Sequence, residues 1–235
     1  MSLAELSVQR ILWANDMDIP VSPPTSARSR RERQKAELRA ELLAAAHALV
    51  QEDGYEGLSI RRLAKRVGYA PMSVYSYFAD KHAILRALAE GAFAALARRA
   101  EKDPPQEPLA ALRKGLNEYA AFGLENPNEY RTVFMVRQVR EEGKSFAQME
   151  AENPALQILL AQVRACIEAG HFEGDVRAIA TMLWTMTHGA VSLLISFPSY
   201  PFGEPREYAA KVIDMALTAA ASTEIPALVP EGWDG

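Results

Sequence analysis

The 235-residue chain contains a single cysteine, and no apolar run reaches the roughly 18–20 residues that a membrane span needs. One cysteine rules out an internal disulfide framework and fits a reducing compartment. Cys166 falls in an apolar helical pattern, so we expect a buried structural thiol rather than a redox sensor. The first residues show neither the basic stretch nor the apolar core of a secretion signal. We therefore expect a cytoplasmic protein with no membrane partner.

The signatures of common enzyme and metal sites are also missing from the sequence. It has no Gly-x-Ser-x-Gly motif, no phosphate-binding glycine loop, and no His, Cys, Asp and Glu residues grouped at metal-ligand spacing. The four histidines are scattered along the chain. We therefore expect no catalytic residue, no metal and no cofactor, and an all-helical enzyme is the weakest of the alternatives.

Charge is distributed unevenly along the chain, although the net charge is only −4. Residues 26–100 hold 14 Lys and Arg against 8 Asp and Glu, whereas residues 101–235 hold 11 against 19. A basic block beside an acidic block is typical of a nucleic-acid-binding end joined to a different domain, although chance segregation gives the same pattern.

The apolar residues recur at spacings of three and four, and no segment alternates with period two. This pattern predicts an all-α protein with an N-terminal three-helix domain and a larger helical domain. A Pro-rich break at residues 103–108 separates the two. The predicted divisions are an extension at 1–29, a helix-turn-helix at 30–80, a connecting helix at 81–101, an effector-binding and dimerisation domain at 102–223, and a tail at 224–235.

Residues 54–85 carry the strongest local pattern. Ser59 is suited to cap a short amphipathic helix that Gly68 ends, and Pro71 is suited to open the next helix at its first position. Asp80 is placed to cap a long fourth helix. Two short helices joined by a tight glycine turn are the layout of a helix-turn-helix, whose second helix enters the DNA major groove.

Specific DNA binding needs phosphate contacts that fix the register and base contacts that read the sequence. Arg61 and the hydroxyl of Ser59 suit phosphate, and small or flexible side chains at the start of the helix after Pro71 suit the groove floor. A solvated basic helix beside core tyrosines is the alternative. The predicted DNA-binding residues are Ser59, Arg61, Met72, Ser73, Tyr75, Ser76, Tyr77 and Lys81.

Residues 36–85 resemble the N-terminal domain of the TetR/AcrR family of bacterial transcriptional repressors. The resemblance implies that Tyr75, Tyr77 and Lys81 contact DNA. It also places Ser59 on a phosphate. Ala70 departs from the family's frequent Ser or Thr, which removes one hydroxyl contact. The matching pieces are Gly54, Leu58-Ser59-Ile60, Leu63-Ala64, Val67-Gly68, Val74-Tyr75, Tyr77-Phe78, Lys81 and Ile84-Leu85.

The acidic half carries one distinctive pattern, in which Trp184 and His188 are i,i+4 neighbours followed by Gly189. It is similar to the Trp…His-Gly signature of one branch of TetR-type C-terminal domains. A place beside an effector cavity is the functional interpretation, and ordinary core packing is the alternative. The predicted ligand-binding residues are Tyr119, Phe122, Met135, Met182, Trp184 and His188, which suit a largely apolar small molecule.

The helices predicted near 175–197 and 205–223 are apolar over broad faces, so we expect them to pair with a second copy in a homodimer. Two recognition helices related by a two-fold axis would read a palindromic double-stranded DNA operator. The predicted function is a DNA-binding transcriptional regulator, a repressor released from its operator by a small apolar ligand. A regulator with no small-molecule effector is the main alternative.

Overall fold

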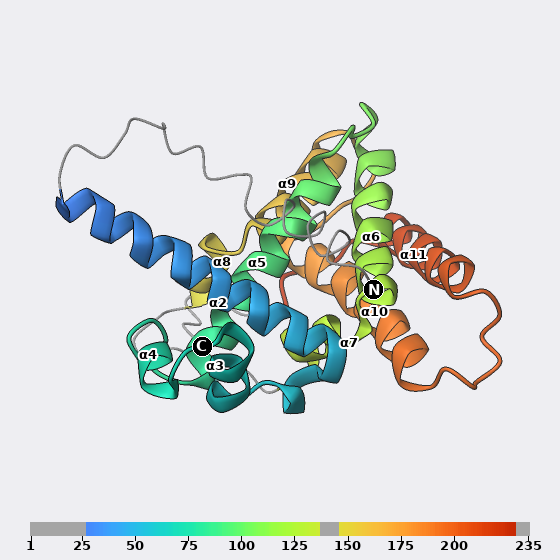
Figure 1. Ribbon diagram of the computed structural model, residues 1–235. Helices are drawn as coiled ribbons and strands as arrows, with labels where there is room; N and C mark the ends of the chain where they lie inside the picture. Colours follow the sequence, from blue (N-terminus) through green and yellow to red (C-terminus); the bar gives the residue numbers. More distant parts are fainter. Residues whose placement is uncertain (1–26, 137–145, 229–235) are drawn as a thin grey trace. The chain divides into compact units, whose positions relative to one another are not determined.

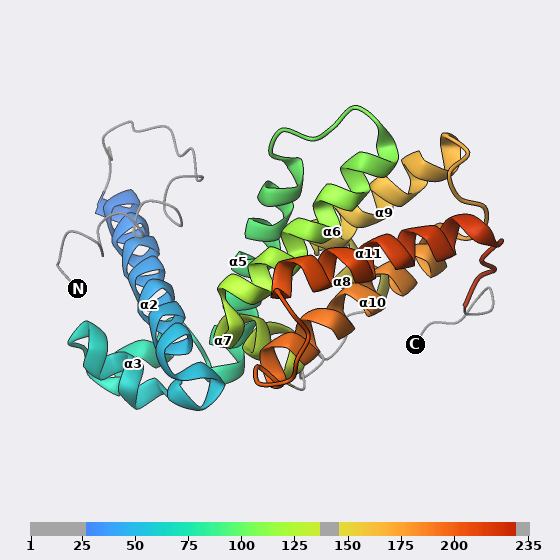
Figure 2. The same ribbon diagram turned by 90° about the vertical axis from the view of Figure 1, so that its right-hand side faces the viewer.

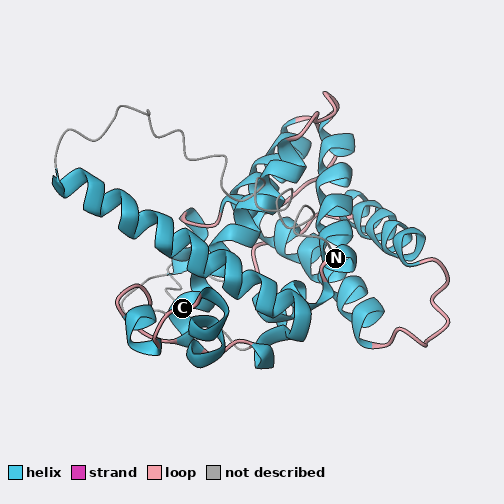
Figure 3. Ribbon diagram, in the orientation of Figure 1, coloured by secondary structure: helices cyan, strands magenta, loops and turns pink. Residues whose placement is uncertain are grey.

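The computed structural model describes residues 27–136 and 146–228. The predicted N-terminal linker before residue 27 and the tail after residue 228 lie outside the described residues. Within the described ranges the chain forms helices joined by loops, with no β-strand (Figure 3). The all-α fold class is therefore confirmed. The chain divides into two compact units, one holding the residues up to Gly91 with Thr132–Val136, and the other holding the remainder.

The first unit contains α2 (Ala27–Gly57), α3 (Ile60–Val67), α4 (Pro71–Tyr75) and the first half of α5 (Lys81–Glu101) (Figure 1). Each of these helices contributes apolar side chains to one core, because the residues that recur at helical spacing all turn inward. The buried residues of this core are Leu42, Ala46, Leu49, Val50, Leu58, Leu63, Ala64, Val74, Phe78, Ile84, Leu85 and Leu88.

The second unit is built on α6 (Pro108–Glu125), α9 (Pro154–Glu168), α10 (Val176–Ser196) and α11 (Pro205–Ser222). All four helices begin after a side-chain cap, and three have proline in the first turn. Figure 2 shows α11 lying along α6 and α10, which it contacts. Cys166 is buried in α9 as expected, and burial raises the pKa of its thiol to about 11.

Between α6 and α9 the structure departs from the sequence prediction. The spacing of apolar residues predicts a single helix at residues 128–141. The structure instead has α7 (Pro127–Tyr130), a π-helix over Arg131–Met135 and, beyond the gap, α8 (Phe146–Ala151). Residues 137–141 of the expected helix lie outside the described residues. In the π-helix each turn takes one extra residue, which the spacing of apolar residues alone does not reveal.

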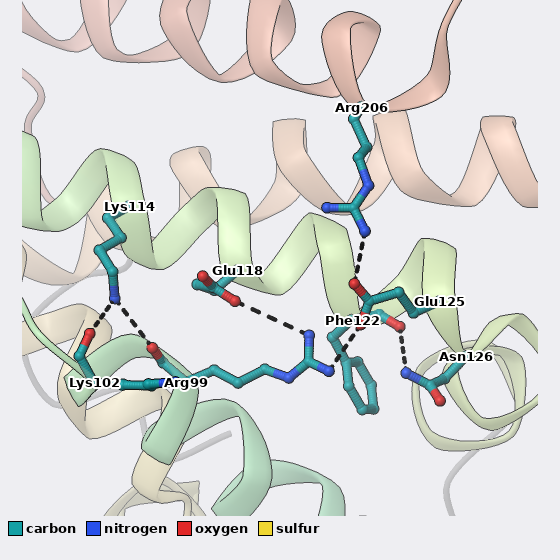
Figure 4. Close-up of polar contacts among 8 residues, drawn as sticks. All are labelled: Arg99, Lys102, Lys114, Glu118, Phe122, Glu125, Asn126 and Arg206. Carbon is teal, nitrogen blue, oxygen red and sulfur yellow. Dashed lines mark hydrogen bonds and ion pairs between the residues drawn. The ribbon is translucent and has the colours of Figure 1, made fainter.

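A polar clamp holds the end of α5 to α6 and α11 (Figure 4). The Glu125 carboxylate accepts hydrogen bonds from Arg99 at 2.8 Å and from Arg206 at 2.7 Å. These hydrogen bonds, the one from Arg99 first, hold the pKa of Glu125 below its ordinary value. Lys114 donates to the backbone carbonyls of Arg99 and Lys102, which closes the C-terminus of α5.

By length and composition alone, α10 would be able to cross a membrane. Half of that span is buried inside the second unit, however, where α10 packs against α6, α9 and α11. Its hydropathy is therefore accounted for by its place in the core.

Candidate DNA-binding surface and effector site

The turn between α3 and α4 is fixed by its two caps. The Ser59 hydroxyl oxygen accepts a hydrogen bond from the backbone N–H of Arg62, and Gly68 ends α3 with a positive φ of 77°. Pro71 then starts α4 at the first helical position. These three features were predicted from the sequence and are confirmed. The Ser59 hydroxyl still has its own proton, which a phosphate oxygen would accept.

The short helix α4 presents one face to solvent and the other to the core. Val74 is fully buried and Phe78 nearly so, whereas the side chains of Met72 and Tyr75 are 76% and 50% exposed. The spacing of Val74 and Phe78 predicts a helix that runs through Phe78, but the helix ends at Tyr75. Tyr77 therefore lies in the following turn and is half-buried against the core. Ser73 is half-buried and Ser76 is exposed.

The basic side chains of α3 fall into two pairs with different partners. Arg62 donates to Asp53 at 2.5 Å, and Arg66 binds Glu52 through two hydrogen bonds of 2.6 Å. These contacts fasten α3 to the end of α2. Arg61 and Lys65, one turn apart, are exposed.

The ammonium group of Lys81 is bound within the first unit. It donates a hydrogen bond of 2.9 Å to the backbone carbonyl of Tyr55 and lies 3.5 Å from the centre of the Tyr55 ring. Burial lowers the pKa of Lys81. A DNA contact by Lys81 would therefore compete with its contact to Tyr55.

In the second unit, four side chains from three helices form one polar cluster. The indole N–H of Trp184 donates to the Tyr119 hydroxyl at 3.1 Å. The Tyr119 and Tyr130 hydroxyls are 2.9 Å apart, and they lie 3.0 Å and 2.6 Å from Nδ1 of His188. Thus α6, α7 and α10 are joined by hydrogen bonds as well as by apolar packing.

The titration of these groups favours one arrangement of protons. Burial raises the pKa of Tyr119 to about 12 and raises that of Tyr130 further, so both hydroxyls keep their protons. Burial also lowers the pKa of His188, which favours the neutral ring. A neutral ring that accepts at Nδ1 carries its proton on Nε2.

A partly open cavity of about 220 Å³ lies beside this cluster, with Trp184 as the shared residue. Most of its lining is apolar, and two of the residues that line it, Glu150 and Arg177, form an ion pair of 2.8 Å. An apolar body with a polar end would match this lining. The lining residues are Glu150, Asn153, Leu156, Leu160, Arg177, Ala180, Thr181 and Trp184.

Both halves of the chain match family models. Residues 42–88 match the model described as bacterial regulatory proteins, tetR family, and residues 112–216 match the tetracyclin repressor-like C-terminal domain. The chain belongs to the TetR family. Members of this family are DNA-binding transcriptional regulators, so the chain belongs among regulators rather than enzymes. The narrower Trp…His-Gly branch stays a prediction.

Individual relatives agree with the TetR assignment. The class A tetracycline repressor protein from transposon 1721 of Escherichia coli is 31% identical over 151 residues, which are 64% of this chain and 63% of that repressor. The TetR-family regulator PfmR of Thermus thermophilus is 25% identical with a TM-score of 0.55, over 75% of this chain and 97% of PfmR. A Rhodococcus sp. RHA1 protein of unknown function shares the fold, at 24% identity and a TM-score of 0.66, over 79% and 96% of the two chains.

The structure places the predicted ligand residues of this TetR-family chain in different surroundings. It brings Tyr119, Trp184 and His188 together, but of the predicted ligand residues only Trp184 lines the cavity. Phe122 is buried and Met182 is exposed. Met135 belongs to the first unit.

Sequence reasoning did not find Tyr130 or most of the cavity lining. The usable signal for Tyr130 is an aromatic hydroxyl three residues after Pro127, at the end of the short helix that this proline starts. Arg177, Ala180, Thr181 and Trp184 share one face of α10 at spacings of three and four. That spacing was visible in the sequence, but its partners on α8 and α9 follow only from tertiary packing.

Proposed function

We propose that this TetR-family chain is a homodimeric transcriptional repressor that binds a palindromic operator and is released from it by a small ligand. One observation carries the DNA-binding part of this proposal. On helix α4 the side chains of Met72 and Tyr75 are exposed to solvent, while Val74 packs into the core. A recognition helix has this arrangement. Ser59, Arg61, Ser73, Ser76, Tyr77 and Lys81 complete the proposed DNA-binding set.

The dimer is proposed from the outer face of the last two helices. Met182, Met186 and Leu193 recur along the exposed side of α10, and Met215 is exposed on α11. Large apolar side chains that recur on one exposed face are typical of an interface. A second copy on this face would give two recognition helices per assembly, related by a two-fold axis.

The effector is proposed to be a small molecule with an apolar body and one polar end. The cavity beside Trp184 supports this proposal, since Leu156, Leu160 and Ala180 give it an apolar lining and the lining pair Glu150 and Arg177 supplies charge. By linkage, an effector that weakens operator binding must itself be bound less tightly by the operator complex, by the same factor.

Selection of bound duplexes from a random pool tests the DNA-binding part directly. We expect a palindromic sequence with half-sites about one helical turn apart, ~34–36 Å. Met72→Ala and Ser73→Ala should change which sequence is selected, because both residues are proposed to face the groove. Tyr200→Phe, on the second unit and outside the proposed DNA-binding and dimer residues, is the control and should leave the preference unchanged. Enrichment of no sequence by folded protein would refute the proposal.

A further inference from the structure

Trp184 belongs to two features at once, and this sharing carries an inference about regulation. Its side chain is 41% exposed and forms a wall of the cavity, while its indole N–H donates to Tyr119. A molecule that fills the cavity would contact the indole. Any rotation of the indole lengthens or breaks the hydrogen bond to Tyr119, since an indole has only one N–H donor.

From Tyr119 the hydrogen bonds lead to α7. The Tyr119 hydroxyl contacts both the Tyr130 hydroxyl and Nδ1 of His188, and Tyr130 lies 2.6 Å from the same nitrogen. The space around Tyr130 is tight. A Cβ added at Gly123 would lie 2.8 Å from the Tyr130 ring and 2.5 Å from Val191. The Tyr130 ring is therefore closely packed on the side that faces Gly123.

The chain leaves this cluster directly for a segment of the first unit. Tyr130 ends α7, and Arg131 donates to the backbone carbonyl of Ile195 on α10. The next residues, Thr132–Val136, belong to the first unit. Residues 131–135 form the π-helix, a geometry that often marks functional sites. Two consecutive residues are thus fastened to α10 immediately before the chain enters the unit that carries α4.

We propose that the hydrogen-bonded cluster of Trp184, Tyr119, His188 and Tyr130 couples the state of the cavity to the segment Thr132–Val136, and through it to operator binding. Trp184 senses the occupant, and Tyr130 positions the segment that follows it. This inference rests on the proposed function, because it requires an operator. Because coupling is reciprocal, the proposal also predicts that operator binding changes the surroundings of Trp184, which can be measured without an effector.

The test uses the full-length chain and the duplex obtained by selection. Trp13 and Trp233, the other two tryptophans, are replaced by phenylalanine so that Trp184 is the sole indole. We expect its emission maximum to shift when the selected duplex is added and not when a scrambled duplex is added. Tyr119→Phe should abolish the shift. Tyr200→Phe, which removes a hydroxyl from an exposed tyrosine outside the cluster, should retain it.

Two results would count against the inference in different ways. A selected duplex that binds without any change in Trp184 emission overturns the coupling and leaves the proposed function intact. Failure to select any duplex overturns both. If Tyr119→Phe does not fold, hydrogen exchange of the parent protein replaces it. Backbone amides of residues 127–136 should then change their exchange rate on operator binding, and an unchanged rate overturns the coupling.

Discussion

Two glycines in the second unit should respond differently to the same substitution. Gly123 and Gly189 both lie inside helices, α6 and α10. A Cβ at Gly123 would lie 2.5 Å from Val191 and 2.8 Å from the ring of Tyr130, whereas a Cβ at Gly189 meets no atom within 4 Å. Alanine removes the conformational freedom of glycine at both positions, so the difference between the two variants reports the overlap at Gly123.

The magnitudes follow from this geometry. Alanine in a helix interior is favoured over glycine by about 1 kcal/mol, so Gly189→Ala should stabilise the chain by up to that amount. At Gly123 the same gain is opposed by overlap with Val191 and Tyr130, both fully buried. Forcing extra carbon atoms into a packed core costs about 1–3 kcal/mol. We expect the free energies of unfolding of the two variants to differ by the overlap cost, about 1–3 kcal/mol, or ~2–12 °C in Tm.

Urea and thermal unfolding followed by circular dichroism measure this difference. Because Gly189 lies on the proposed dimer face, unfolding should be repeated at several protein concentrations. If Gly189→Ala is destabilised only at the protein concentrations at which dimers form, the added methyl group meets a second copy of the chain beside Gly189. If Gly123→Ala is as stable as Gly189→Ala, the tight packing of α6 against α10 and Tyr130 is refuted.

The remaining predictions concern α4 and the polar clamp. Val74→Ala deletes two buried methyl groups and should lower the free energy of unfolding by about 1.5–3 kcal/mol. Met72→Ala, on the exposed side of α4, should lower it by almost nothing. Equal losses for the two variants in urea unfolding would contradict the orientation assigned to α4. For Glu125, whose folded pKa is held below the ordinary 4.5, the stabilisation is present above that pH and is lost as the pH falls through the folded value. Glu125→Gln should therefore lower Tm at neutral pH, and the loss should become progressively smaller below pH 4.5. A difference in Tm between parent and variant that stays constant across the pH range would show that the ion pairs with Arg99 and Arg206 contribute nothing.

Local signals in the sequence predicted the helix-turn-helix well. Ser59, Gly68, Pro71 and Asp80 each act within three or four residues of their own position, and the structure confirms the caps and the glycine turn. Capping depends on the chemistry of one side chain and on nearby backbone, which a sequence displays directly. The same holds for Val74, whose burial follows from helical spacing.

The contacts that join distant segments were not predictable in the same way. Lys81 and Tyr55 are 26 residues apart, and no local pattern pairs them. The cavity depends on how α8 and α9 pack against α10, and among the predicted ligand residues only Trp184 lines it. Its hydrogen bond to Tyr119 spans 65 residues. Such pairs are set by tertiary packing. The sequence therefore indicated individual residues such as Lys81 and Trp184, but not which residues they contact.

The pairing of the basic residues on α3 has a consequence for the response of the protein to ionic strength. Arg62 and Arg66 are already neutralised by Asp53 and Glu52, which leaves Arg61 and Lys65 as the charges that α3 offers to a polyanion. Each phosphate neutralised releases counterions and adds about −0.9 to the slope of log K against log salt concentration. Each copy of α3 should then contribute about −1.8 to this slope, rather than the −3.6 that four free basic side chains would give. The affinity for DNA should therefore fall less steeply with added salt than the number of basic side chains on α3 suggests.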